Sequence, residues 1–424
     1  MSCFGSLQRK IGRIHILVVS QYFYPEAFRI NDMAVEWVRR GYRVTVLTGI
    51  PNYPEGRFFD GYGFCARRCE CWNGVKIIRL PVVPRGKGGI RLVLNYASFA
   101  CSSWIWNKIT RLRADLVFTY EVSPMTQALA GCWHAGKNHV PHYLYVTDLW
   151  PENVESVTGI RHKAVILPLQ MMSDYIYRHS ERILTSSRSF MEPVRKRGID
   201  ASRIEFWPQY AEDFYRPAEK KGSLLPQDGV PNLVFAGNAG RAQGLDILVR
   251  AAVLLRRENI HVRFYIIGNG RCLGELKRSV KSARVERYFG FIPQVPAEEV
   301  PRYFAFADAL LITLAESDVF SRTIPAKTQS CMACGRPVLV SADGEVQEII
   351  KAAGAGLCSG AGDACEFVGI IKEFLDMGEG QRKQLAENAL SYSGKYFNKE
   401  QLLGRLDEIF MQEGRHPGKG RNGT

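Results

Sequence analysis

Short, mostly apolar runs that alternate with helical patterns recur along the chain and constrain its fold more than any other feature. In the first half they cover residues 14–19, 44–47, 116–119, 143–146 and 182–185. In the second half they cover residues 233–236, 263–267, 309–313 and 337–340. Such runs are typical of strands buried on both faces of a parallel sheet, and their alternation with helices indicates doubly wound α/β layers. Two series of this kind predict two Rossmann-like domains that face a central cleft.

The segment FWPQYAEDFYRP, residues 206–217, separates the two series. We therefore predict an N-terminal domain over residues 1–210 and a C-terminal domain over residues 211–399. A helix at about 400–415 would pack back on the first domain. No apolar stretch reaches the ~18–20 residues that a membrane-spanning helix needs. The early apolar run lacks a small-residue cleavage site and is interpreted as a core strand, not as a signal peptide.

The positive charge lies mainly in the first half of the chain. The formal net charge is +14, and residues 1–210 contain 28 Lys and Arg against 16 Asp and Glu. A basic half would attract nucleic acid, anionic lipid headgroups or phosphorylated substrates. The 11 cysteines follow no regular disulfide framework, which favours a reducing, cytoplasmic setting.

Three strand-to-helix turns in the second half are candidate phosphate or nucleotide sites. The strongest is FAGNAGRAQGLD, residues 235–246, in which a strand enters a glycine loop that also carries Arg241. Such loops present backbone N–H groups to phosphates, although a turn that serves packing alone is the alternative. The segments 266–277 and 288–296 follow on the same predicted sheet edge. A nucleotide triphosphate loop is excluded because no Gly-Lys-Ser/Thr ending is present.

Charged residues beside these turns are candidates for chemistry. Thr323, Pro325 and Lys327 form a loop that could offer N–H groups and an ammonium to an anion, whereas the alternative is a solvated surface lysine. In the first domain, Glu26 and Asp148 each follow an apolar strand. For Asp148 the alternative is a turn or helix-cap carboxylate.

Two further segments leave alternatives open. CARRCECW, residues 65–72, holds three cysteines, but no fourth metal ligand lies at suitable spacing. The segment 92–108 has no charge before Lys108 and is predicted to be either a buried helix or a helix at a membrane interface. The basic residues that flank it are Arg85, Lys87, Arg91, Arg111 and Arg113.

Taken together, five motifs resemble the retaining GT-B glycosyltransferases of family 4. Within that family the chain is similar to bacterial N-acetyl-L-fucosamine transferase-type enzymes of O-antigen and capsule synthesis. The motifs are SQYFYPEAFRINDMAVEWVRRGYRVTVLTGIPNYPEG (20–56), YVTDLWPENV (145–154), GNAGRAQGLDILVRAA (237–252), IIGNG (266–270) and TIPAKTQSCMACGRPVLVSADGEVQEII (323–350). They occur in the family's order, and the resemblance runs from about Ile14 to about Ile371.

The resemblance implies a UDP-sugar donor in the second domain and a polyprenyl-diphosphate-linked glycan as acceptor in the first. It also implies retention of the anomeric configuration, no metal and no other cofactor, and a cytoplasmic enzyme peripheral to the anionic inner face of the membrane. The positions matched to donor binding are Gly237, Asn238, Gly240, Arg241, Gln243, Gly244, Gly268, Asn269, Gly270, Phe291, Ile292, Thr323, Pro325, Ser330 and Glu345. The candidate catalytic residues are Lys327, Arg322, Asp148 and Glu26.

The chain departs from the family pattern at its carboxylates and donor-loop cations. Arg322 and Ser330 occupy the two positions of the usual Glu-x7-Glu pair, and Asn238 and Gln243 occupy those of an Arg and a Lys. We expect Arg241, Arg322 and Lys327 to supply positive charge, and Glu345 to supply a hydroxyl-binding carboxylate. The alternatives are a UDP-sugar 2-epimerase of the same architecture and a nucleic-acid-binding protein. The latter fits poorly, because the glycine loops lie in the less basic half.

Overall fold

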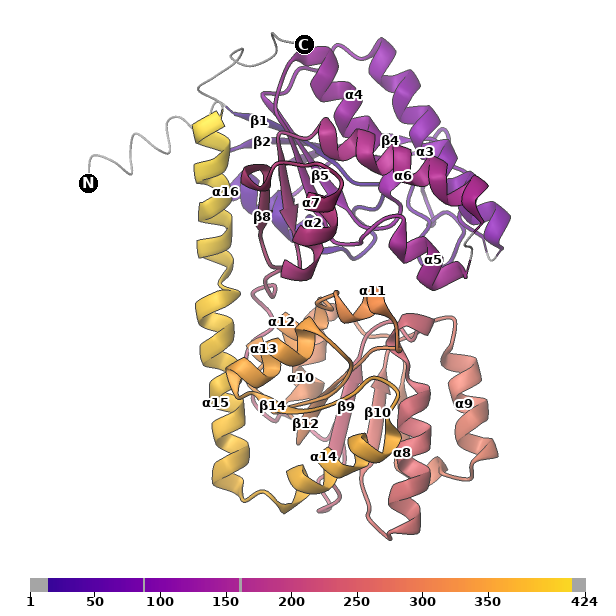
Figure 1. Ribbon diagram of the computed structural model, residues 1–424, viewed down its shortest axis with the longest axis vertical. Coiled ribbons are helices and arrows are strands. Elements are labelled where there is room, and N and C mark those ends of the chain that lie inside the picture. The colour runs from indigo at the N-terminus through magenta and orange to yellow at the C-terminus, as the bar shows by residue number, and fades with distance from the viewer. Residues whose placement is uncertain (1–13, 87, 160–161, 414–424) are drawn as a thin grey trace, which may run out of the picture.

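Two parallel sheets, each flanked by helices, form the two lobes of the molecule (Figure 1). A computed structural model describes residues 14–86, 88–159 and 162–413. The first lobe lies above the second in Figure 1, and the helices near the C-terminus run along one side of both. The sheets are doubly wound, so this part of the sequence prediction is confirmed.

The first sheet has eight strands in the order β3-β4-β2-β1-β5-β6-β7-β8, parallel except for β3. Its strands are β1 (His15–Val19), β2 (Arg43–Gly49), β3 (Cys69–Trp72), β4 (Val75–Leu80), β5 (Leu116–Glu121), β6 (His142–Val146), β7 (Arg182–Thr185) and β8 (Ile204–Phe206). Its helices are α2 (Arg29–Arg39), α3 (Gly89–Ile109), α4 (Ala128–Asn138), α5 (Glu152–Thr158), α6 (Lys163–Arg178) and α7 (Met191–Lys196).

The second sheet has six parallel strands in the order β11-β10-β9-β12-β13-β14. Its strands are β9 (Asn232–Ala236), β10 (Arg263–Ile267), β11 (Phe289–Ile292), β12 (Ala309–Thr313), β13 (Val338–Ser341) and β14 (Gly356–Ser359). Its helices are α8 (Asp246–Arg257), α9 (Leu273–Ser282), α10 (Val300–Phe304), α11 (Asp318–Ser321), α12 (Lys327–Ala333), α13 (Glu345–Ala353), α14 (Ala364–Asp376) and α15 (Glu379–Tyr396).

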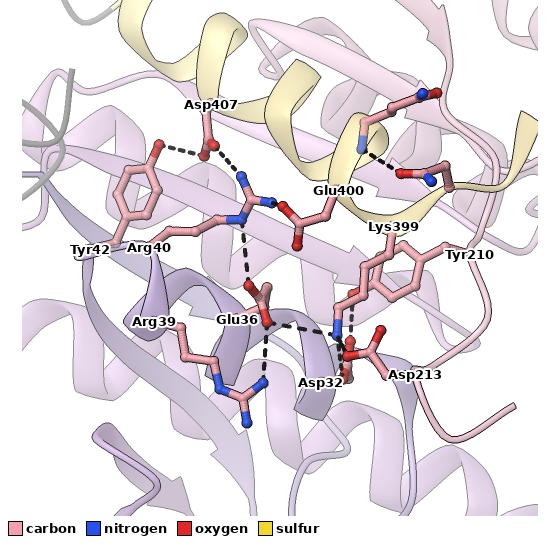
Figure 2. A network of polar contacts seen from close by, with 12 residues as sticks. Asp32, Glu36, Arg39, Arg40, Tyr42, Tyr210, Asp213, Lys399, Glu400 and Asp407 are labelled. Atoms are coloured by element: carbon pink, nitrogen blue, oxygen red, sulfur yellow. Dashed lines mark hydrogen bonds and ion pairs between the residues drawn. The ribbon is translucent and has the colours of Figure 1, made fainter. Parts of the chain in front are cut away.

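The last helix, α16 (Lys399–Glu413), packs on the first lobe although α15 packs on the second. Its apolar face, formed by Leu402, Leu403, Leu406, Ile409 and Phe410, belongs to the same core cluster as strands β1 and β5. A polar network flanks this face (Figure 2). In it, Arg40 donates to Asp407 over 2.7 Å and Lys399 donates to Asp213 over 2.7 Å. The first lobe is thus completed by residues from the far end of the chain.

All nine predicted strands are present, and the structure adds β3, β4, β8, β11 and β14 at or near the sheet edges. Edge strands were missed because their residues alternate between exposed and covered sides, as β3 does. The domain boundary at residues 210 and 211 stays a prediction. Within the described ranges, no helix combines the length and the apolar character needed to cross a membrane.

Candidate active site

The three predicted turns of the second lobe form one continuous surface at the carboxyl ends of β9, β10 and β11. The Gly237 N–H donates to the Ile267 carbonyl over 2.9 Å, and the Ala239 N–H donates to the Asn269 carbonyl over 2.7 Å. The Gly268 N–H reaches the carbonyl of Ile292. Gly268 has a φ of +137°, and a Cβ there would strike the Gly237 carbonyl oxygen. Glycine is therefore required by the close approach of two loops.

Lys327 reaches over this surface from the first position of α12. Its ammonium donates to the Gln243 side-chain oxygen and lies 3.6 Å from the centre of the Phe235 ring. A Cβ built on Gly237 would lie 3.4 Å from its Nζ. In the described ranges, Lys327 has no carboxylate at ion-pair distance. Burial lowers the pKa of Lys327 to about 7. The site therefore holds a cation without a counter-ion beside a glycine loop.

The other donor-side candidates divide into exposed and internally bonded groups. Asn238, Arg241 and Asn269 are exposed at the loop surface, next to the partly covered Gly240, Gly244 and Gly270. The Thr323 hydroxyl donates to the Val319 carbonyl, and the Ser330 hydroxyl donates to the Ala326 carbonyl within α12. Pro325 is buried and Phe291 is partly covered. Lys327 begins α12, so the loop predicted to carry it ends one residue earlier.

Glu345 and Arg322 lie where the second lobe contacts the first. One Glu345 oxygen accepts from the Arg188 N–H over 2.8 Å. The other accepts from the Ser189 N–H over 2.8 Å and from the Ser187 hydroxyl. The carbonyl of Arg322 is also within reach of the Ser187 hydroxyl, while its side chain is exposed. The structure thus joins Glu345 to the other lobe, and its assignment to the donor site stays a prediction.

Glu26 and Asp148 differ in how their oxygens are used. One Glu26 oxygen accepts from the N–H groups of Asn52 and Tyr53, each over 2.7 Å, and the other accepts from the Phe23 N–H over 3.3 Å. Burial raises the pKa of Glu26 to about 7, although these donors act against it. Asp148 accepts from the Ser123 N–H over 2.8 Å with one oxygen and is partly exposed. Burial also raises the pKa of Asp148. Both catalytic assignments stay predictions.

A group of aromatic side chains around Arg85 was not singled out from the sequence. The rings of Tyr22, Tyr53 and Tyr96 surround its guanidinium at 5.2 to 6.0 Å. The available signal was the repeated placement of tyrosine after strands, in QYFYP and PNYPEG. Three segments far apart in the chain contribute the rings, so no local pattern revealed that they meet.

The structure decides against the buried-helix alternative for residues 92–108. On α3 the covered side chains are Asn95, Phe99, Ser103 and Asn107, whereas Val93 and Ile105 are 65% and 55% exposed. The helix therefore turns a polar stripe inward and apolar residues outward. Of the flanking cations, Lys87 lies outside the described residues. Cys65, Cys69 and Cys71 are exposed, and the described residues include no cluster suited to a metal ion.

Comparison with known proteins matches both lobes. Residues 27–209 match the glycosyl transferase 4-like domain, and residues 218–391 match the glycosyl transferases group 1. The chain is 27% identical to the glycosyltransferase WbjE of Pseudomonas aeruginosa over 55% of its own length and 60% of that protein. It is 25% identical to WcaI of Escherichia coli K12, a glycosyl transferase of colanic acid biosynthesis, over 77% of its own length and 83% of the relative.

Solved structures share the two-lobed fold. Sucrose-phosphate synthase from Thermosynechococcus elongatus superposes with a TM-score of 0.75 at 15% identity, over 94% of this chain and 99% of that one. HepE of Anabaena in complex with UDP-glucose superposes with a TM-score of 0.69 at 14% identity, over 94% of this chain and all of that one. At these identities the likeness shows the fold, which is that of GT-B glycosyltransferases.

Proposed function

Because the chain belongs to the group 1 glycosyltransferases and carries their 4-like N-terminal domain, we propose that it transfers a sugar from a UDP-sugar to a lipid-diphosphate-linked glycan. The sugar would be an N-acetylated hexosamine or deoxyhexosamine. The acceptor would belong to the synthesis of a surface polysaccharide. Transfer would retain the anomeric configuration and take place at the inner face of the membrane.

The observation that carries the proposal is Lys327. Its ammonium faces a glycine loop and a neutral amide, and no carboxylate of the described chain balances its charge. Such a group is stabilised by an anion that arrives with a ligand, and the diphosphate of a nucleotide sugar supplies one.

The relatives support the proposed substrate classes. HepE, which shares the fold, was solved with UDP-glucose bound. WcaI belongs to colanic acid biosynthesis and AmsK of Erwinia amylovora to amylovoran biosynthesis. A polymer built at the cell surface would start from a lipid-linked intermediate, and the outward apolar face of α3 fits an enzyme that works at a membrane.

Catalysis would depend on stabilising the leaving diphosphate. Negative charge grows on it as the glycosidic bond breaks, so a fixed cation strengthens its contact in the transition state. Lys327 and the loop N–H groups would meet that charge without a metal or other cofactor. Arg241 and Arg322, both exposed at the same edge, would assist. On the acceptor side, Asp148 has one oxygen that accepts the Ser123 N–H and could receive the proton of the attacking hydroxyl with the other.

Substitution of Lys327 tests the proposal. We expect Lys327→Ala to lower the turnover number about a hundredfold to a thousandfold, the ~3–4 kcal/mol typical of removing a group that stabilises developing charge. The Michaelis constant for the donor should change less. Steady-state kinetics with the polymer-specific UDP-sugar, or hydrolysis of that donor alone, measures both constants.

Lys351 offers a matched control, because it also donates to a glutamine side chain, Gln347, but from the exposed surface of α13. Lys351→Ala should leave both constants within twofold of the parent. If the turnover number of Lys327→Ala stays within about threefold of the parent value, the activation barrier has changed by less than ~1 kcal/mol. That result would contradict a role for Lys327 in the reaction.

A further inference from the structure

Arg85 is a cation enclosed by aromatic rings and held without a counter-ion. Its guanidinium carbon lies 5.2 Å from the ring centre of Tyr53, 5.9 Å from that of Tyr96 and 6.0 Å from that of Tyr22. Its Nη1 donates to the Tyr22 hydroxyl over 3.3 Å. No carboxylate of the described residues lies at ion-pair distance from it. Ring faces stabilise and orient a guanidinium but leave its N–H groups free for an anion.

The enclosure is rigid because a buried polar network holds it. The Asn52 side-chain oxygen accepts from the backbone N–H of Arg85 over 2.9 Å. Glu26 in turn holds the N–H groups of Asn52 and Tyr53. The carboxylate predicted to be catalytic thus positions the loop that surrounds Arg85. A site of this kind is formed before its ligand arrives.

A second arginine belongs to the first turn of α3, shortly after Arg85 in the chain. Arg91, in the first turn of α3, packs its side chain against Gly86, the residue that follows Arg85. That turn contains no acidic residue. Arg91 also has no carboxylate partner among the residues that the structure describes. The connection from β4 into the first turn of α3 therefore carries two arginines, which suits a ligand with more than one negative charge.

The turn between β4 and α3 lies near the candidate catalytic residue Asp148 on one side and the exposed apolar residues of α3 on the other. The ring of Tyr96 lies 6.5 Å from that of Trp150, which follows Asp148 closely in the chain. Burial raises the pKa of Tyr96. The charge of Asp148 raises it further, whereas the charges of Arg85 and of Arg271 in the second lobe lower it. On its other side, the turn leads directly into α3, whose apolar residues are exposed.

We infer that Arg85 and Arg91 bind the diphosphate of the lipid-linked acceptor, with the lipid chain along α3 and the sugar directed toward Asp148. The inference rests on the proposed function and names the part of the first lobe that would recognise the acceptor. Arginine pairs with phosphate oxygens through two parallel hydrogen bonds, and the rings of Tyr22, Tyr53 and Tyr96 would fix its plane. The same chemistry would fit the headgroup of an anionic phospholipid, so the test must separate the two.

Titration with farnesyl diphosphate at saturating UDP tests this site. UDP occupies the diphosphate site of the second lobe, so the measured dissociation constant reports the first lobe. We expect Arg85→Gln to weaken the binding of farnesyl diphosphate at least about tenfold, because the charge is lost. Arg85→Lys should weaken this binding at least about threefold, because an ammonium cannot form the two parallel hydrogen bonds of a guanidinium. The matched control is Arg111→Gln, an exposed arginine beyond the other end of α3, which should stay within twofold.

The possible results distinguish a diphosphate site from a phospholipid site. They also distinguish a failure of this inference from a failure of the proposed function. Unchanged farnesyl diphosphate affinity in both Arg85 variants overturns the inference. Binding of the parent to phosphatidylglycerol vesicles but not to farnesyl diphosphate, with loss of vesicle binding in Arg85→Gln, would identify a phospholipid site and also overturn it. If Arg85→Gln fails to bind UDP or to unfold cooperatively, Arg85→Lys decides. If the parent protein does not bind UDP, the result contradicts the proposed function and not this inference.

Discussion

The environment of Lys327 predicts that the rate of the reaction depends on pH. Its pKa of about 7 means that the ammonium is present at lower pH and is lost as the pH rises through 7. The neutral amine cannot balance a diphosphate. We therefore expect kcat/KM for the donor, which reports the free enzyme, to fall above pH 7 by about tenfold per pH unit. Rates measured from pH 6 to pH 9 would show this limb.

Arginine at position 327 provides the control, because its guanidinium stays charged throughout that range. In Lys327→Arg the lower overall rate should no longer fall above pH 7. A limb that persists unchanged in Lys327→Arg would assign the titration to another group. Asp148 would not explain such a limb, because a carboxylate that receives a proton becomes active as the pH rises.

Single carboxylates show how far the sequence can predict a site. The position of Glu26 and Glu345 beside strand ends was evident from the motifs, but their partners were not. Glu26 holds N–H groups 26 and 27 residues away, and Glu345 holds those of Arg188 and Ser189, 157 and 156 residues away. Backbone donors have no sequence signature, so a carboxylate that fixes a loop looks the same as one that binds a sugar.

At the scale of the element, α3 combines an exposed apolar face with nearby arginines. Replacement of the 55% exposed Ile105 by Asp should change the free energy of unfolding by less than about 0.5 kcal/mol. It should weaken binding to phosphatidylglycerol vesicles roughly tenfold, because an aliphatic side chain contributes ~1.5–3 kcal/mol when fully buried. Vesicle co-sedimentation measures the change, and added salt should release the electrostatic part.

Tyr396 on α15 is the comparison residue, since it is 47% exposed but lies away from α3. Tyr396→Asp should bind vesicles as the parent does. Equal effects of the two substitutions would indicate nonspecific adsorption, and no vesicle binding by the parent would contradict a membrane role for α3.

Elements differ in how well the sequence predicts them. Strands such as β1 and β12 contain four consecutive apolar residues that a parallel sheet buries on both faces, so their position is locally encoded. The orientation of α3 is not encoded locally, because its apolar residues are distributed almost evenly around the helix. The packing of α4 against it selects the stripe of Asn95, Phe99, Ser103 and Asn107 as the inner face.

At the scale of the molecule, α16 is fastened to the first lobe by buried ionic contacts (Figure 2). Asp407 accepts from Arg40 over 2.7 Å and from the Tyr42 hydroxyl over 2.8 Å, and its side chain is 8% exposed. Asp407→Ala would leave a mostly covered arginine short of its main partner. We expect a loss of about 2–4 kcal/mol in the free energy of unfolding, measured by urea denaturation.

Glu400 is the matched control because it pairs with the same Arg40 from an exposed position, with 72% of its side chain accessible. Glu400→Ala should cost less than about 1 kcal/mol, as surface ion pairs do. Equal losses of unfolding free energy in the two variants would mean that burial of an ion pair does not determine its contribution to stability.

The packing of α16 also determines when one core cluster of the first lobe can close during synthesis. Ile16, Trp37 and Phe118 share a core cluster with Leu402 and Phe410. At about 5–20 residues per second, the roughly 190 residues between Tyr210 and Leu402 take on the order of 10–40 s to emerge. A core cluster of the second lobe has all its buried members between Leu233 and Phe374, so it needs nothing from α16. The lobe that leaves the ribosome first therefore contains a core cluster that closes later than one of the second lobe.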